Sequence, residues 1–260
     1  MGCFCLYDVY YWYMHDKEFK KIINELKRDK NILAIILTGS RGKGFENKYS
    51  DYDLIIITKN DSYSEVKKLY KEYISKDLDL MFHSLSGFQQ YAMSGTAYEW
   101  DRYTFAHVKI IYSKIKNLKK LIHDKGYLQN NQKRKFIEQS LDGYINGVYR
   151  FAKCFRNKNK IGAHLEAVNS VLDLLTLVFA MNQRYRPFLT YVEQELINYP
   201  LKELPWSNKY LLKKVKLILK SGNLKTQREL FKDIKSWCVK EGYVHIFKAW
   251  KGKDELIMKL

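Results

Sequence analysis

The chain has 260 residues, of which 46% are hydrophobic and 15% aromatic, and this composition excludes a disordered chain. A length of this order allows one large domain or two ordinary ones. The 46 lysines and arginines against 28 aspartates and glutamates give a formal charge of +18. Because the excess is almost all lysine spread along the chain, rather than arginine clustered among aromatic residues, nucleic acid is not the expected partner.

Strands alternate with helices in the first half of the chain. Apolar residues at helical spacing predict an amphipathic helix over residues 16–29, and the continuous apolar run of residues 31–38 predicts a buried strand. A polar turn follows, with one helical turn starting at Ser40. We also predict strands over 51–58, 77–84 and 107–113, and a helix over 61–75. This alternation indicates a layered α/β unit.

Helical patterns dominate the second half. Residues 132–182 are predicted to be helical, and the three prolines of the chain, at 187, 200 and 205, follow in a loop-rich connection. Two more helices are predicted over 206–220 and 226–240. We therefore predict two domains, an α/β domain over residues 1–128 and a helical bundle over residues 129–260.

Export and membrane insertion are not expected. The opening residues lack the basic start and small-residue cleavage site of a signal peptide, and we expect Met14 to be the natural initiator. The longest apolar run, over residues 171–181, is interrupted by Asp173 and is too short to span a bilayer. The four cysteines, at positions 3, 5, 154 and 238, form no disulfide or metal-binding framework. We therefore expect a cytoplasmic protein with reduced thiols and no membrane partner.

Two aspartates open the second predicted strand. On a strand, residues i and i+2 point the same way, so Asp51 and Asp53 share one face. Two like charges so close together repel each other, and folding tolerates them only if a positive charge lies between them. Mg²⁺ suits such a pair, because it takes one or two carboxylates and fills its other positions with water and substrate phosphates.

A glycine-rich turn precedes these aspartates. Gly39 and Ser40 lie between a strand and a predicted helix start, where small residues allow close approach and free backbone N–H groups suit an anion. Arg41 and Lys43 add positive charge to the same turn. The turn and the carboxylates together therefore indicate a site for a metal-bound phosphate compound.

The whole pattern resembles the DNA polymerase β-like nucleotidyltransferase superfamily, whose signature is an apolar strand, Gly-Ser, a spacer near ten residues and Asp-x-Asp. Here the signature stands as Gly-Ser at residues 39–40, ten residues, and Asp-Tyr-Asp at residues 51–53. That family needs a third carboxylate on a later strand, for which Asp77 and Asp79 are candidates. We favour Asp79, because apolar residues flank it on both sides.

The resemblance implies an α+β fold, with a mixed β-sheet flanked by helices and then a C-terminal α-helical bundle. The helical half looks like the accessory bundle of antibiotic nucleotidyltransferases such as the kanamycin enzyme. It implies Mg²⁺-dependent transfer of a nucleoside monophosphate, with AMP from ATP as the first expectation, to a hydroxyl of a small molecule, with release of pyrophosphate. An antibiotic of the aminoglycoside type is the first candidate acceptor. A less charged, lincosamide-like molecule suits a chain of charge +18 better.

The resemblance also assigns roles to residues. The metal-binding and catalytic residues would be Asp51, Asp53 and Asp79, and the nucleotide phosphates would be held by Gly39, Ser40, Arg41 and Lys43. Asp79 is one candidate for the general base, and Glu166 and Asp173 of the helical half are others. The segment around Arg184 and Arg186 suits phosphate geometry and equally suits a simple helix end.

Two other functions remain open from the sequence. One is an adenylyltransferase that acts on a protein or nucleic acid acceptor, and the other is a catalytically inactive nucleotide-binding regulatory protein. Intact Asp51 and Asp53 argue against the second. The oligomeric state is also open, although related enzymes can place their active site between the two subunits of a homodimer.

Overall fold

A computed structural model describes the backbone of residues 6–260 and the side chains of residues 17–260. The chain divides into two compact units, one that ends at Tyr127 and one that begins at Leu128. Cys154 and Cys238 are free thiols, whereas Cys3 and Cys5 lie outside the described residues.

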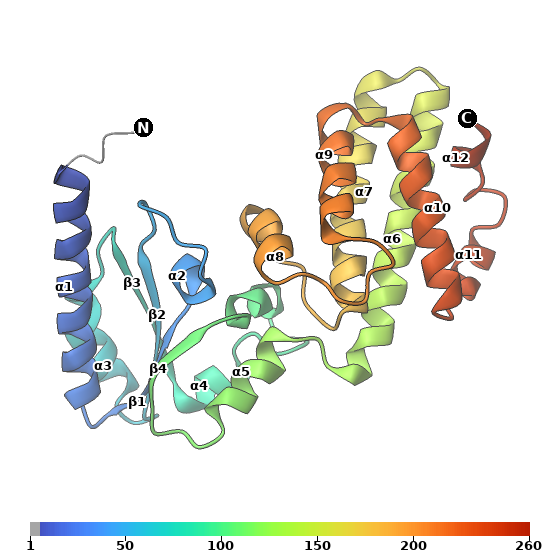
Figure 1. Ribbon diagram of the computed structural model, residues 1–260. Helices are drawn as coiled ribbons and strands as arrows, with labels where there is room; N and C mark the ends of the chain where they lie inside the picture. The colour runs from blue at the N-terminus through green and yellow to red at the C-terminus, as the bar shows by residue number, and fades with distance from the viewer. Residues whose placement is uncertain (1–5) are drawn as a thin grey trace. The chain divides into compact units, whose positions relative to one another are not determined.

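The first unit contains a four-stranded mixed sheet (Figure 1). Its strands are β1 (Ile32–Leu37), β2 (Tyr52–Thr58), β3 (Leu78–Ser84) and β4 (Lys109–Ser113). The spatial order is β3-β2-β1-β4, with β2 parallel to β3 and the other neighbours antiparallel. Its helices are α1 (Leu6–Arg28), α2 (Gly39–Lys43), α3 (Tyr63–Tyr70), η1 (Lys71–Tyr73), α4 (Leu85–Gln90), η2 (Glu99–Phe105) and α5 (Leu118–Gly126). The predicted mixed sheet flanked by helices is confirmed.

Helices cover both faces of the central strands. On one face, α1 and α3 pack against residues such as Ile35, Leu54 and Ile56. On the other face, α4, η2 and α5 pack against Ile36 and Ile55. This two-sided cover explains why β1 and β2 read as continuous apolar runs rather than as alternating ones.

The second unit is helical, as predicted. Its helices are α6 (Asn130–Arg156), α7 (Lys160–Met181), η3 (Leu189–Tyr191), α8 (Val192–Asn198), α9 (Asn208–Ser221), α10 (Leu224–Lys240), α11 (Val244–Ala249) and α12 (Leu256–Lys259). The helices α6 and α7 form its central hairpin and cross closely at Gly147, where an added Cβ would lie 2.9 Å from Cβ of Ser170. Helix α7 is long and apolar enough by length and composition to cross a membrane, which the sequence analysis did not expect. More than half of that apolar stretch is buried, and its residues form the core of the unit.

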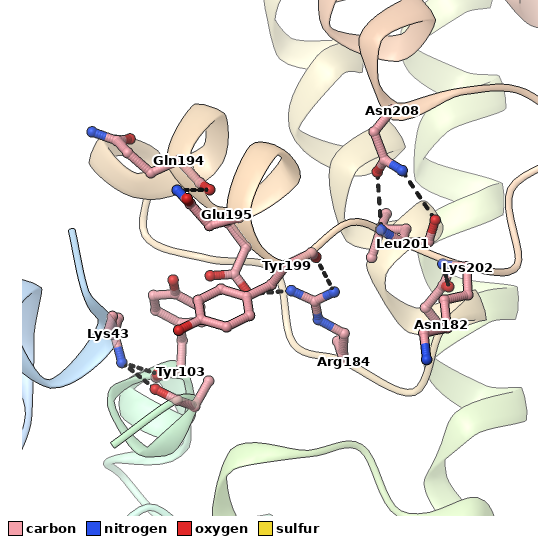
Figure 2. A network of polar contacts seen from close by, with 12 residues as sticks. Lys43, Tyr103, Asn182, Arg184, Gln194, Glu195, Tyr199, Leu201, Lys202 and Asn208 are labelled. Atoms are coloured by element: carbon pink, nitrogen blue, oxygen red, sulfur yellow. Dashed lines mark hydrogen bonds and ion pairs between the residues drawn. The ribbon is translucent and has the colours of Figure 1, made fainter. Parts of the chain in front are cut away.

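An ion pair fixes the loop after α7. Arg184 donates to the carboxylate of Glu195 on α8 and, at 2.6 Å, to the main-chain oxygen of Tyr199 (Figure 2). The Glu195 side chain is only 1% exposed. Nearby, the side-chain oxygen of Asn182 accepts from the backbone N–H groups of Lys202 and Glu203, at 2.9 and 2.8 Å. The proline-containing segment is therefore held by specific polar contacts.

We expect Glu195→Ala to lower the free energy of unfolding by about 3 kcal/mol, because it removes the buried partner of Arg184, whose side chain is only 14% exposed. Glu166→Ala is the matched control, because Glu166 pairs with a largely exposed Arg150, and it should cost at most about 1 kcal/mol. Urea unfolding followed by circular dichroism measures both values. Equal losses in the two variants would contradict this assignment.

Candidate functional site

The parallel pairing of β2 with β3 sets two predicted site residues side by side. Asp53 and Asp79 are direct partners in the register of this pair. Asp51 comes one residue before β2 begins, and its charge, like that of Asp79, acts on the Asp53 carboxyl. The structure therefore brings Asp51, Asp53 and Asp79 to one edge of the sheet. Asp77, the other candidate, instead lines a cavity with α1 residues Glu18 and Phe19.

Asp53 lies directly against the glycine turn. Gly39 has a φ of +55°, and a Cβ at this position would lie 1.7 Å from Oδ2 of Asp53. Only glycine meets both conditions. Thr38 fixes the main chain on the other side, because its backbone N–H donates to the carbonyl oxygen of Asp53 at 2.9 Å. The carboxylate of Asp53 is thus held over the Cα of Gly39.

The electrostatics of Asp53 favour a cation. Burial first, and then the negative charges of Asp51 and Asp79, raise the pKa of the Asp53 carboxyl from 3.8 to about 6, against an opposing effect of Lys43. Such a cluster of oxygen ligands suits a hard divalent cation, which would relieve the repulsion. Within residues 17–260 no group of three or more His, Cys, Asp or Glu side chains is placed to hold a metal ion, so the three carboxylates do not form a complete set of ligands in this structure. Mg²⁺ does not need such a cage, because it keeps water and phosphate ligands.

Ser40 is suited to the phosphate role that the resemblance implies. It lies in the first turn of α2, is 9% exposed, and its hydroxyl makes no hydrogen bond to any of the described residues. The helix packs very closely on β1, since a Cβ at Gly42 would lie 2.5 Å from the carbonyl oxygen of Leu37. The turn therefore presents a small hydroxyl and main-chain atoms next to Asp53.

The two cations of the turn, Arg41 and Lys43, donate to main-chain carbonyls of the first unit, and the phosphate-binding role expected of them stays a prediction. Lys43 is 1% exposed, and its ammonium donates to the carbonyl oxygens of Tyr103, Thr104 and Ala106 at 3.2, 3.1 and 2.5 Å. Figure 2 shows the bond to Tyr103. Arg41 donates to main-chain oxygens at the entry to β2. The physical reason is that a buried ammonium or guanidinium needs partners, and backbone carbonyls are within reach.

The helical candidates also have partners of their own. Glu166 accepts from Nε of Arg150 at 2.7 Å. Asp173 packs on α6, where a Cβ at Gly143 would lie 2.9 Å from its carboxyl, and burial raises its pKa against the opposing charge of Arg186. The Nε of Arg186 donates to Thr176 at 3.1 Å. The first two contacts join α6 to α7, and the third ties the loop after α7 to that helix. They favour the structural interpretation of Glu166, Asp173 and Arg186.

Sequence reasoning missed Thr38 and the role of η2. Thr38 ends the apolar run before Gly39, and no pattern distinguishes a strand-ending threonine that holds Asp53 from an ordinary one. The carbonyls that accept from Lys43 come from η2 and the residue after it, which the sequence analysis did not predict as an element.

Comparison with known proteins finds one family similar to the part of the chain that contains the site. Residues 20–94 match the family described as polymerase beta, nucleotidyltransferase. This stretch, less than a third of the chain, contains the glycine turn and all three carboxylates, and it is similar to that family over this length. A solved structure, a nucleotidyltransferase-like protein from Exiguobacterium sibiricum, shares 14% identity with a TM-score of 0.38, over 86% of this chain and 78% of that chain. No match was found among curated proteins.

We expect Asp53→Asn to stabilise the metal-free protein by about 1 kcal/mol at pH 7, less than the pKa shift alone would give, because the group is partly solvated. The pKa is raised on folding, so ionisation disfavours the folded state as the pH rises from about 4 to about 6. The stabilisation by Asp53→Asn should therefore vanish below about pH 4, where the carboxyl becomes protonated in both the folded and the unfolded protein. Thermal unfolding with chelator at several pH values measures it, and a loss of stability at pH 7 would contradict it.

We expect Lys43→Met to lower the free energy of unfolding by about 2–4 kcal/mol, because it removes three hydrogen bonds, two of them buried, that a charged donor makes to main-chain carbonyls. The control is Lys48→Met, which makes the same change at an exposed position and should stay within about 0.5 kcal/mol. Denaturant titration compares them. Similar changes in the free energy of unfolding for Lys43→Met and Lys48→Met would show that the contacts of Lys43 with the carbonyls do not stabilise the protein.

Proposed function

We propose that this protein is a Mg²⁺-dependent nucleotidyltransferase that moves a nucleoside monophosphate, AMP from ATP in the first instance, to a hydroxyl of a small molecule. The observation that carries the proposal is the register pair Asp53–Asp79 beside Asp51, at a sheet edge that faces a glycine turn. The family of the domain supports nucleotidyl transfer as the general activity.

The donor nucleotide is assigned to the turn. Gly39 lets the main chain approach Asp53, and Ser40 offers a hydroxyl with no other partner among the described residues. A divalent cation held by Asp51, Asp53 and Asp79 would neutralise the carboxylates and the phosphate oxygens together. The three carboxylates would act as its ligands, and the turn would orient the triphosphate.

In the proposed reaction, the acceptor oxygen forms a bond to the α-phosphorus, and the bond from that phosphorus to the bridging oxygen of pyrophosphate breaks. The hydroxyl proton must go to a base. Asp79 is our candidate, because it is exposed at the edge strand opposite Asp53. Glu166 is less suited, since its carboxylate already accepts from Arg150.

An antibiotic acceptor is part of the proposal. Its support is the resemblance of the helical half, residues 128–260, to the bundle of antibiotic nucleotidyltransferases. A chain of charge +18 repels polycations at long range, so a weakly charged, lincosamide-like hydroxyl compound is favoured over an aminoglycoside.

The test is pyrophosphate release from each of the four nucleoside triphosphates with Mg²⁺, against aminoglycosides, lincosamides and simple polyols. We expect release that requires one acceptor, and a loss of at least about 100-fold in Asp51→Asn and in Asp53→Asn, because each removes charge that holds the cation. Asp61→Asn, an exposed aspartate in the same unit, is the matched control and should keep full activity. Release that persists in Asp53→Asn would overturn the site. Mg²⁺-dependent binding of a triphosphate without release would direct the search to macromolecular acceptors.

A further inference from the structure

The side chain of Arg41 connects the two parts of the motif. Arg41 belongs to α2, just after the Gly-Ser pair. Its Nε donates to the carbonyl oxygens of Ser50 and Asp51 at 3.1 and 3.0 Å, and its Nη2 donates to that of Ser50 at 2.9 Å. Arg41 is therefore hydrogen-bonded to the two residues that directly precede β2.

Aromatic stacking fixes the plane of the guanidinium. The central carbon of the Arg41 guanidinium lies 3.9 Å from the ring centre of Tyr52. Tyr52 in turn stacks on Phe19 of α1, with ring centres 4.0 Å apart and planes inclined by 15°. Tyr52 is the middle residue of the Asp-Tyr-Asp motif and faces the core opposite to the carboxylates. Arg41 is thus held both by carbonyls and by a packed ring.

The anchoring of Asp51 has a counterpart at Asp53. Thr38, before the Gly-Ser pair, donates its backbone N–H to the carbonyl oxygen of Asp53, and Arg41, after the pair, donates to that of Asp51. Both carboxylate residues are therefore tied to the turn through their main chains, which leaves their side chains to other ligands. The preceding loop is itself closed by hydrogen bonds between Asn47 and Ser50.

We propose that Arg41 is a positioning residue, which sets the Asp51 carboxylate for the metal ion instead of binding a phosphate. This inference rests on the metal site of the proposed function. Arginine is needed because its planar fork reaches two carbonyls while its face stacks on Tyr52, and a lysine ammonium cannot do both.

A phosphate contact and a positioning role predict different results without nucleotide. A phosphate-binding arginine affects the affinity for the triphosphate and leaves metal binding by the nucleotide-free protein unchanged. A positioning arginine changes the affinity for the metal alone, because loss of an outer contact typically weakens a metal site by about 10–100-fold.

The experiment is a Mn²⁺ titration of the nucleotide-free protein, followed by electron paramagnetic resonance, for the wild type, Arg41→Ala, Arg41→Lys and Arg28→Ala. We expect Arg41→Ala to bind Mn²⁺ about 10–100-fold more weakly, Arg41→Lys to recover little of this, and millimolar guanidinium to restore binding in Arg41→Ala. Arg28→Ala removes an exposed arginine of the same unit and should match the wild type. Circular dichroism checks folding. If Arg41→Ala does not fold, Arg41→Lys, which keeps the charge, decides the result.

Wild-type Mn²⁺ affinity in both Arg41 variants would overturn the positioning role. The proposed function can fail separately, because a wild type that binds Mn²⁺ but transfers no nucleotide would refute only the transfer. A wild type that binds no Mn²⁺ would overturn both.

Discussion

The repulsion among three carboxylates at one edge of the sheet is the constraint on which the first unit depends. Parallel pairing of β2 with β3 sets Asp53 opposite Asp79, and Asp51 stands just outside the same strand. Hydrogen bonds from the turn fix the main chain of Asp51 and Asp53 despite this repulsion. Gly39 supplies the space, and Thr38 supplies one of the hydrogen bonds. Such a fixed cluster of carboxylates is typical of a site that binds a cation.

Some of the positive charges of the chain are buried and stabilise the fold of the first unit. Lys43, Arg102 and Lys125 are each at most 1% exposed, and each donates to main-chain carbonyls of the first unit. Burial and the nearby Arg102 lower the pKa of Lys125 to about 8. The formal charge of +18 therefore includes at least these three cations that are buried in the first unit.

The sequence was informative wherever a periodic pattern coincides with a structural constraint. The apolar runs predicted β1, β2 and β3 to within a residue or two at each end, and period-two alternation predicted that residues 51 and 53 share a face. The helices α4, α5 and η2 were not predicted, because they are short and their apolar residues lack a long period. The inward direction of Lys43 and Arg41 could not be predicted either. Both depend on which carbonyls the tertiary fold brings within reach.

The most direct test of the account is a crystal structure of the protein with Mn²⁺ and a non-hydrolysable ATP analogue, with anomalous scattering used to locate the metal. The account predicts a Mn²⁺ peak within ligand distance of the carboxylates of Asp51 and Asp53, with the phosphates over Gly39 and Ser40 and the Arg41 guanidinium still bound to the carbonyl of Asp51. A nucleotide bound with its metal away from these carboxylates, or with its phosphates on Arg41, would contradict it.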